Sequence, residues 1–229
     1  AKVMFENMVP LEYAVKISNY FEFACSFIGE DFGIYPPHTF KIYIFGEQQG
    51  LVRGLVNLAG WTVAQAEYFA KEGLNPAPIN WVQYMTMALN MQGFCHEYTH
   101  AMIEKLSGKD SRFAFKWLDE GLADYEGHAC MSQWYPDAAT AYWHMRKAIV
   151  LDAYRSGLLF KLGDIATEPE WSKRIQRSDF EFNLEYAEAF VAVTKLVDMR
   201  GFSSVMKFLR EWNRSAGFAA QFESAFGFS

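Results

Sequence analysis

The sequence predicts an α+β fold, with a mixed α/β part over residues 1–107 and a helical part over residues 108–229. Segments rich in β-branched and aromatic residues, which favour strands, occur ahead of Gln83. From Gln83 onward, apolar residues recur at helical spacing toward the C-terminus. Because no linker separates the two parts, we expect one domain over residues 1–229 with two subdomains.

The first part is expected to contain one helix and a small sheet. Residues 11–28, LEYAVKISNYFEFACSFI, carry apolar side chains every three or four positions, which indicates an amphipathic helix that ends near Gly33. Residues 38–45, HTFKIYIF, are typical of a strand. Residues 59–69, AGWTVAQAEYF, are interpreted as a second strand or hairpin arm, and residues 79–82, INWV, as a third short strand.

The second part is expected to be built from helices. A long helix runs from Gln83 to about Leu106 without a proline, and Gly108 is a suitable C-terminal stop. The stretch 157–182 contains Pro169 and few helical signals, so we expect it to be irregular. Further helices are predicted over residues 116–130, 137–156, 183–200, 203–213 and 218–226.

The composition is that of a globular protein. Of the 229 residues, 51% are hydrophobic and 21% are charged, which excludes a disordered chain. The net charge is −6 and no run of lysine and arginine stands out, so we expect no nucleic-acid partner. No apolar run approaches the roughly 18 residues that a membrane span needs. We expect a soluble protein of unknown compartment, with export open because the first residue is Ala, as after removal of an N-terminal segment.

The stretch GFCHEYTH, residues 93–100, contains two histidines four positions apart with a glutamate directly after the first. On a helix, His96 and His100 project from one face about one turn apart, so both imidazoles can reach one metal ion. Glu97 lies beside the first histidine, where it can act as a general base toward water at the metal. The motif alone arises by chance in roughly one such chain in a hundred, so it needs further support.

A third metal ligand is available in WLDEGLADY, where Glu120 lies twenty positions beyond His100. A catalytic zinc ion keeps three protein ligands, drawn from nitrogen, sulfur and carboxylate donors, and Glu120 completes such a set. Asp124, four positions later, shares the same helix face. We expect Asp124 to accept the free ring N–H of a ligating histidine, with His96 as the expected partner.

HEYTH followed by WLDEGLADY resembles the gluzincin zinc metallopeptidases, also called the peptidase MA-like family, whose pattern is H-E-x-x-H and then W-x-x-E-G-x-A. The resemblance implies a gluzincin-like metallopeptidase fold for this chain. It also implies a role for each matching residue of the site. The zinc ligands would be His96, His100 and Glu120, and the catalytic base would be Glu97.

Three further positions follow from the same resemblance. EYAEAFVAVTKLVDMRG, residues 185–201, is similar to the helix that opens with a tyrosine in this family, and this gives Tyr186 the role of stabilising the oxyanion. Asp124 is similar to the acid that supports a histidine ligand in thermolysin-like members. Asp119 stands where the aminopeptidases usually have Asn. The resemblance spans residues 11–229 and is strongest over 96–125.

The sequence therefore predicts a zinc-dependent metallopeptidase that holds one Zn²⁺ and hydrolyses a peptide or protein substrate. Zinc-activated water would lose its proton to Glu97. One alternative is an aminopeptidase-type exopeptidase, although the G-x-M-E-N segment that grips a free amino terminus is missing, which favours an endopeptidase or an unusual exopeptidase. Another is a non-catalytic binding module that contains zinc, against which the intact Glu97 and Tyr186 argue.

Overall fold

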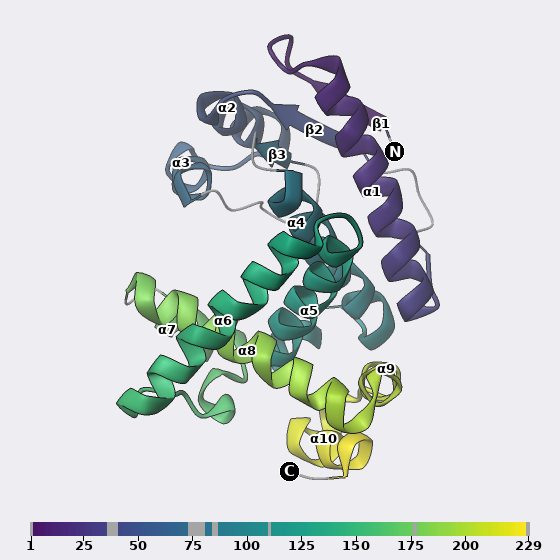
Figure 1. Cartoon of the computed structure of the whole chain (residues 1–229), viewed down its shortest axis with the longest axis vertical. Coiled ribbons are helices and arrows are strands. Elements are labelled where there is room, and N and C mark those ends of the chain that lie inside the picture. Colours follow the sequence, from purple (N-terminus) through teal and green to yellow (C-terminus); the bar gives the residue numbers. More distant parts are fainter. Residues whose placement is uncertain are drawn as a thin grey trace. The chain divides into compact units, whose positions relative to one another are not determined.

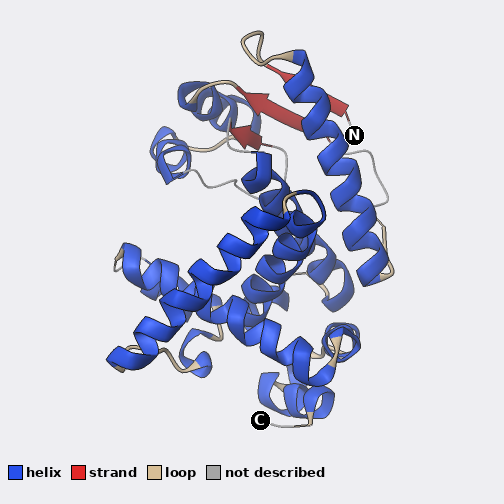
Figure 2. Cartoon of the chain, in the orientation of Figure 1, coloured by secondary structure: helices blue, strands red, loops and turns tan. Residues whose placement is uncertain are grey.

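Helices predominate in the protein, as a computed structural model shows (Figures 1 and 2). The chain divides into two compact units, Ala1–Tyr98 and Thr99–Ser229. The division lies inside helix α4 (Met87–Ser107), ahead of the division after residue 107 that we expected. The structure describes residues 2–35, 41–72, 81–83, 87–109, 111–175 and 178–227.

The first unit contains a short parallel sheet, drawn in red in Figure 2. The strands pair in the order β1-β2-β3, with Val3 opposite Ile42 and Ile44 opposite Val82. Parallel neighbours need a crossover connection. Helix α1 makes the first crossover, and α2 with α3 makes the second. The elements of the first unit are β1 (Lys2–Phe5), α1 (Leu11–Phe32), β2 (Lys41–Phe45), α2 (Gln48–Ala59), α3 (Val63–Glu72), β3 (Trp81–Gln83) and the first part of α4.

Helix α1 confirms the amphipathic pattern predicted over residues 11–28. Phe21, on its buried face, packs edge-on against Phe94 of α4, with ring centroids 6.1 Å apart. The helix ends at Gly33, whose φ of 67° is left-handed and whose N–H bonds the carbonyl of Glu30. Glycine adopts this conformation without the steric penalty of a side chain, so the predicted stop is also confirmed.

The predicted α+β class is wrong, because the protein is predominantly helical. Helices make up 80% of the residues that the structure describes, whereas the strands are four, five and three residues long. A gluzincin-like fold with a sheet-based subdomain is therefore not what the chain forms. Residues 59–69, interpreted as a strand or hairpin arm, lie at the end of α2 and in α3. Strand β2 confirms residues 41–45, while residues 38–40 and 79–80 of the predicted strands lie outside the described residues.

A capping box explains why α3 is a helix. The hydroxyl of Thr62 accepts the N–H of Gln65 at 3.3 Å, and the side-chain oxygen of Gln65 accepts the N–H of Thr62 at 3.1 Å. This reciprocal pair satisfies two of the N–H groups that a helix start leaves without partners. The residues that follow, VAQAEYFAKE, include several strong helix formers. The spacing T-x-x-Q is therefore a local signal that outweighs the strand-like aromatic content.

The second unit is helical over its described residues. It confirms the helices predicted over 116–130, 137–156 and 218–226, and its α8 begins four residues ahead of the predicted start. The stretch 157–182, predicted to be irregular, contains η2 and α7. Its elements are the last part of α4, η1 (Ser111–Ala114), α5 (Lys116–Trp134), α6 (Pro136–Ser156), η2 (Leu162–Ile165), α7 (Glu168–Ile175), α8 (Asp179–Arg200), α9 (Phe202–Arg210), η3 (Arg214–Ala216) and α10 (Phe218–Phe226).

Side-chain caps again account for α7 and for the early start of α8. Thr167 precedes α7, and its N–H and hydroxyl both donate to Glu170, at 3.0 and 2.9 Å. Ser178 precedes α8, and its hydroxyl accepts the N–H of Glu181 at 3.1 Å. Both pairs have the S/T-x-x-E spacing of a capping box. These caps move the helix starts into a stretch that hydrophobic periodicity alone leaves unassigned.

Helix α5 is the central helix of the second unit. It packs against α6 and α8, which lie beside it in Figure 1, and it also contacts α7 and the turns η1 and η2. It is buried on most sides, as expected of a helix surrounded by others. Several of its buried side chains are charged, namely Lys116, Asp119, Glu120, Asp124 and Glu126.

Aromatic side chains attach α9 and α10 to the start of α5. The ring of Phe115, just ahead of α5, lies 5.4 Å from Phe208 and 4.8 Å from Trp212 between ring centroids. Trp117, in the first turn, lies 5.9 Å from Phe222. Such edge-to-face pairs add to the apolar burial. The first turn of α5, between Phe115 and Trp117, is therefore held firmly in place.

Gly121 lets α5 and α8 approach closely. A Cβ atom at this position would lie 2.3 Å from the carbonyl oxygen of Ala189 and 2.7 Å from Cγ2 of Val193. Real Cβ atoms do not approach other heavy atoms this closely, and the nearest obstacle is backbone, which cannot rotate away. The glycine of the WLDEG segment thus has a packing role in this fold.

We predict that Gly121→Ala destabilises the protein. Alanine favours a helix by about 1 kcal/mol over glycine, but overpacking against the α8 backbone costs about 1–3 kcal/mol. The free energy of unfolding, measured by urea denaturation, should therefore fall. Gly163→Ala is the matched control, since a Cβ there meets nothing within 4 Å. Equal stability of the two variants would contradict the close approach.

Candidate metal centre

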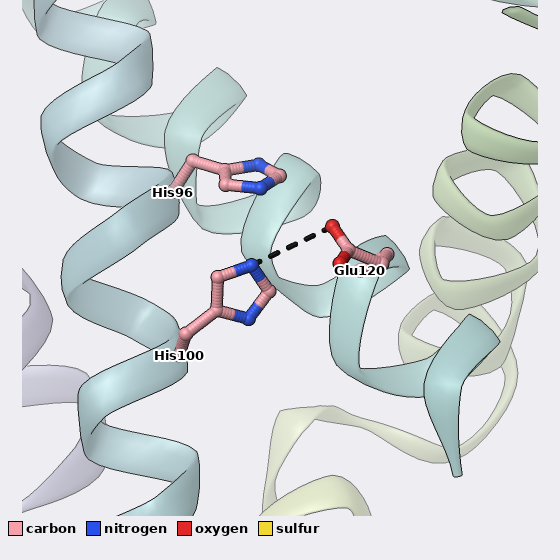
Figure 3. A group of neighbouring side chains, drawn as sticks. All are labelled: His96, His100 and Glu120. Atoms are coloured by element: carbon pink, nitrogen blue, oxygen red, sulfur yellow. Dashed lines mark ion pairs between the residues drawn. The ribbon is translucent and has the colours of Figure 1, made fainter. Parts of the chain in front are cut away.

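Helix α4 carries both predicted histidine ligands. Figure 3 shows His96 and His100 projecting from the same side of this helix toward Glu120 on a neighbouring one. The helical spacing expected from GFCHEYTH is thus realised, because residues four positions apart lie one above the other. His96 is half-buried, while His100 is buried.

Glu120 completes a possible metal-binding group with the two histidines. One ligand atom from each of His96, His100 and Glu120 lies within 4.8 Å of the other two. Nε2 of His100 is 3.5 Å from Oε2 of Glu120, the contact dashed in Figure 3. Two donors about 2.0–2.1 Å from one tetrahedral zinc ion lie about 3.3 Å apart. The donor types and this spacing therefore fit a divalent transition metal.

Asp119 orients His100. Its Oδ1 lies 2.9 Å from Nδ1 of His100, and both side chains are buried. A proton on Nδ1 donated to this carboxylate leaves the lone pair of Nε2 directed to the Glu120 side, which is the tautomer a metal requires. From the sequence, Asp119 stood out only because the aminopeptidases usually have Asn at this position. Its position directly before the third ligand, on a mostly buried helix, is the signal that could have revealed this role.

Lys116 is a buried cation beside these carboxylates, and the sequence analysis missed it. Its Nζ bonds Glu120 and lies 3.4 Å from Oδ2 of Asp119 and 3.4 Å from Oε2 of Glu168. Burial alone would lower the pKa of Lys116, but Glu120, Asp119 and Glu168 outweigh it and raise the pKa. The i,i+4 spacing of Lys116 and Glu120 was the available signal.

The site carries excess negative charge. Burial lowers the pKa of His100, but the carboxylates of Asp119 and Glu120 outweigh burial and raise it. A cation on the imidazole is thus favoured by its surroundings. A metal ion bound between His100 and Glu120 would be stabilised by the same negative charges.

Asp124 lies one turn beyond Glu120 and belongs to a second buried network. Its Oδ2 accepts hydrogen bonds from the hydroxyl of Tyr142 at 3.0 Å and from Arg146 at 3.2 Å. Burial lowers the pKa of Arg146, but Asp124, Tyr142 and Tyr186 outweigh burial and raise it. These contacts hold the carboxylate of Asp124 against α6. The hydrogen bond that we predicted from the ring N–H of His96 to Asp124 stays a prediction.

The two predicted catalytic residues lie on different helices. Glu97 is half-buried on α4, next to His96. Tyr186 is half-buried on α8, where its ring centroid lies 5.1 Å from that of Trp171 and 5.0 Å from that of Phe182. Those contacts hold the phenol ring in a defined position. The roles of Glu97 as base and Tyr186 at the oxyanion stay predictions.

Comparison of the chain with protein-family models, curated proteins and solved structures finds no match. No helix among the described ranges combines the length and apolar character needed to cross a membrane. The function therefore has to be argued from the chemistry of the site itself.

Replacing Glu120 with Ala should abolish stoichiometric zinc binding, because two imidazoles alone leave the ion without its third protein ligand. The readout is zinc content by elemental analysis after dialysis against trace zinc. Glu223→Ala, at an exposed glutamate of α10, is the matched control and should keep the ion. Unchanged zinc content in the Glu120 variant would remove this residue from the ligand set.

Replacing Asp119 should weaken zinc binding in a graded manner. Asp119→Ala leaves Nδ1 of His100 without its acceptor, and loss of such a contact costs about 10- to 100-fold in metal affinity. Asp119→Asn should cost less, since the amide oxygen can still accept the ring N–H. Titration against a chromophoric chelator measures both dissociation constants. Equal affinity of the Ala variant and the unsubstituted protein would disprove the orienting contact.

Proposed function

We propose that the protein is a zinc-dependent metallopeptidase that hydrolyses peptide bonds in peptide or protein substrates. The observation that supports this is the group formed by His96, His100 and Glu120, whose ligand atoms lie within 4.8 Å of one another. Glu97, directly after the first histidine on α4, adds a carboxylate suited to proton transfer. The proposal concerns the chemistry of the site, since the fold differs from the one expected for gluzincins.

Zinc is the metal that this donor set favours. Two imidazole nitrogens and one carboxylate oxygen are the ligands found in catalytic zinc sites, which keep a fourth position open. Magnesium and calcium prefer oxygen ligands throughout. Three protein ligands hold one ion, so we propose a single Zn²⁺ per chain.

The residues of the site divide the work of hydrolysis. When bound, zinc supplies a Lewis acid that acidifies water and polarises a carbonyl. Glu97 accepts the proton from the attacking water and returns it to the amine as the peptide bond breaks. Tyr186 would donate a hydrogen bond to the carbonyl oxygen as negative charge develops there.

Glu97→Gln is expected to lose peptide hydrolysis and keep its zinc. The amide cannot accept the proton, and loss of general-base catalysis costs about 10²- to 10⁴-fold in rate. None of the three metal ligands changes, so zinc content should stay at that of the unsubstituted protein. Digestion of a peptide library followed by mass spectrometry measures the rate.

The matched control is Glu104→Gln, which makes the same substitution two helical turns further along α4. It should digest the library normally. Full activity of the Glu97 variant would refute the mechanism. Zinc binding by the unsubstituted protein with no cleavage of any peptide would instead identify a non-catalytic zinc-containing binding module. N-acetylated peptides in the same digest separate an endopeptidase from an aminopeptidase, which needs a free amino terminus.

A further inference from the structure

The two oxygens of Glu120 face different partners. Oε1 bonds the ammonium of Lys116, whereas Oε2 lies 3.5 Å from Nε2 of His100. Asp119 is divided in the same way, with Oδ2 3.4 Å from Lys116 and Oδ1 2.9 Å from Nδ1 of His100. One face of this carboxylate pair is thus occupied by a cation, and the other is turned toward the histidine.

We propose that Lys116 is a positioning residue that holds Oε1 of Glu120, so that Oε2 alone is presented to the metal. This inference rests on the proposed function, because it takes Glu120 as a metal ligand. A carboxylate with both oxygens available can bind an ion through both. Ligation through one oxygen keeps the fourth position of a catalytic zinc site open for water and substrate.

Lys116 is anchored well enough for this role. It is only 6% exposed, and its own N–H donates to the carbonyl of Ala166 at 2.6 Å. Glu168, at the start of α7, lies 3.4 Å from the ammonium, and Ser172 donates to the other oxygen of Glu168 at 2.6 Å. A buried ammonium that left these carboxylates would lose its charge partners without regaining water, which is strongly unfavourable. The lysine therefore stays on Oε1 when the opposite oxygen takes a metal.

The charges around Lys116 agree with this arrangement. Asp119, Glu120 and Glu168 contribute three negative charges, of which the ammonium cancels one. The remaining two match a divalent cation held by neutral imidazoles. Lys116 thus neutralises the oxygens that the metal does not use, while Oε2 of Glu120 lies on the side of His100.

The test compares the zinc-loaded protein with Lys116→Met and Lys116→Arg by X-ray absorption at the zinc edge. The unsubstituted protein and the Arg variant, which keeps a cation on Oε1, should show one carboxylate oxygen at the metal. The Met variant should gain about one oxygen neighbour as Glu120 becomes bidentate. Its hydrolysis should fall about 10- to 100-fold while zinc stays bound. An unchanged absorption spectrum in the Met variant would overturn the role of Lys116.

A measurement on the unsubstituted protein covers the case in which the Met variant does not fold. With ¹⁵N-labelled lysine, the NMR signal of the Lys116 ammonium is assigned by its absence in the Arg variant. It should be protected from solvent exchange both without metal and after zinc loading, because Oε1 holds it in both states. Loss of protection on zinc loading would overturn the proposal. An unsubstituted protein that takes up no zinc would overturn the metal centre, and the Lys116 role with it.

Discussion

A carboxylate that is buried away from water loses several kcal/mol of solvation free energy, which cations or hydrogen-bond donors must compensate. Helix α5 buries such groups along its length. Asp119 is 0% and Glu120 5% exposed. Both are satisfied by the same two groups, Lys116 from their own helix and His100 from α4. The contact of α5 with α4 at His100 is thereby set by electrostatics.

The same constraint operates one turn further along α5, with different partners. Asp124 is 2% exposed and accepts hydrogen bonds from Tyr142 and Arg146 of α6. Gly121 lies between the two networks and allows α8 to come close to α5. Three neighbouring helices are thus positioned by consecutive turns of one helix. A metal ligand carried on such a helix is held in a defined place before any metal binds, which is the condition for a selective site.

Buried ion pairs seldom stabilise a fold more than well-packed apolar residues of similar volume would. The charges on α5 are therefore better explained by chemistry than by folding. Donor types and spacing favour a metal, and the ammonium of Lys116 occupies the oxygen of Glu120 that faces away from His100. The network is paired with Lys116 on one side and with His100 on the other, where we propose that a metal binds.

The W-x-x-E-G-x-A stretch shows why a local resemblance predicts a site better than a fold. In this chain Trp117 packs against the C-terminal aromatic residues, Glu120 faces His100, and Gly121 admits α8. All three tasks concern one helix and its immediate neighbours. None of them requires a sheet, so the motif is compatible with a largely helical protein, and function has to be argued from the site.

What the sequence by itself determined lies within single helices. Periodicity of 3.6 residues predicted α1, α5 and α6, and it placed His96 above His100 and Asp124 one turn beyond Glu120. Helix α3 was also encoded locally by its T-x-x-Q cap, although aromatic residues typical of strands obscured this signal.

Only the tertiary structure decided which side chains meet. It paired Asp119 with His100, and it brought Glu168 of α7 to Lys116 of α5, although α6 and η2 lie between them in the chain. It also gave Gly121 its packing role, because a Cβ atom at this position would collide with the backbone of α8. These contacts depend on how closely and at what angle helices cross, and that outcome is set by the packing of many side chains together, not by the spacing of any one motif.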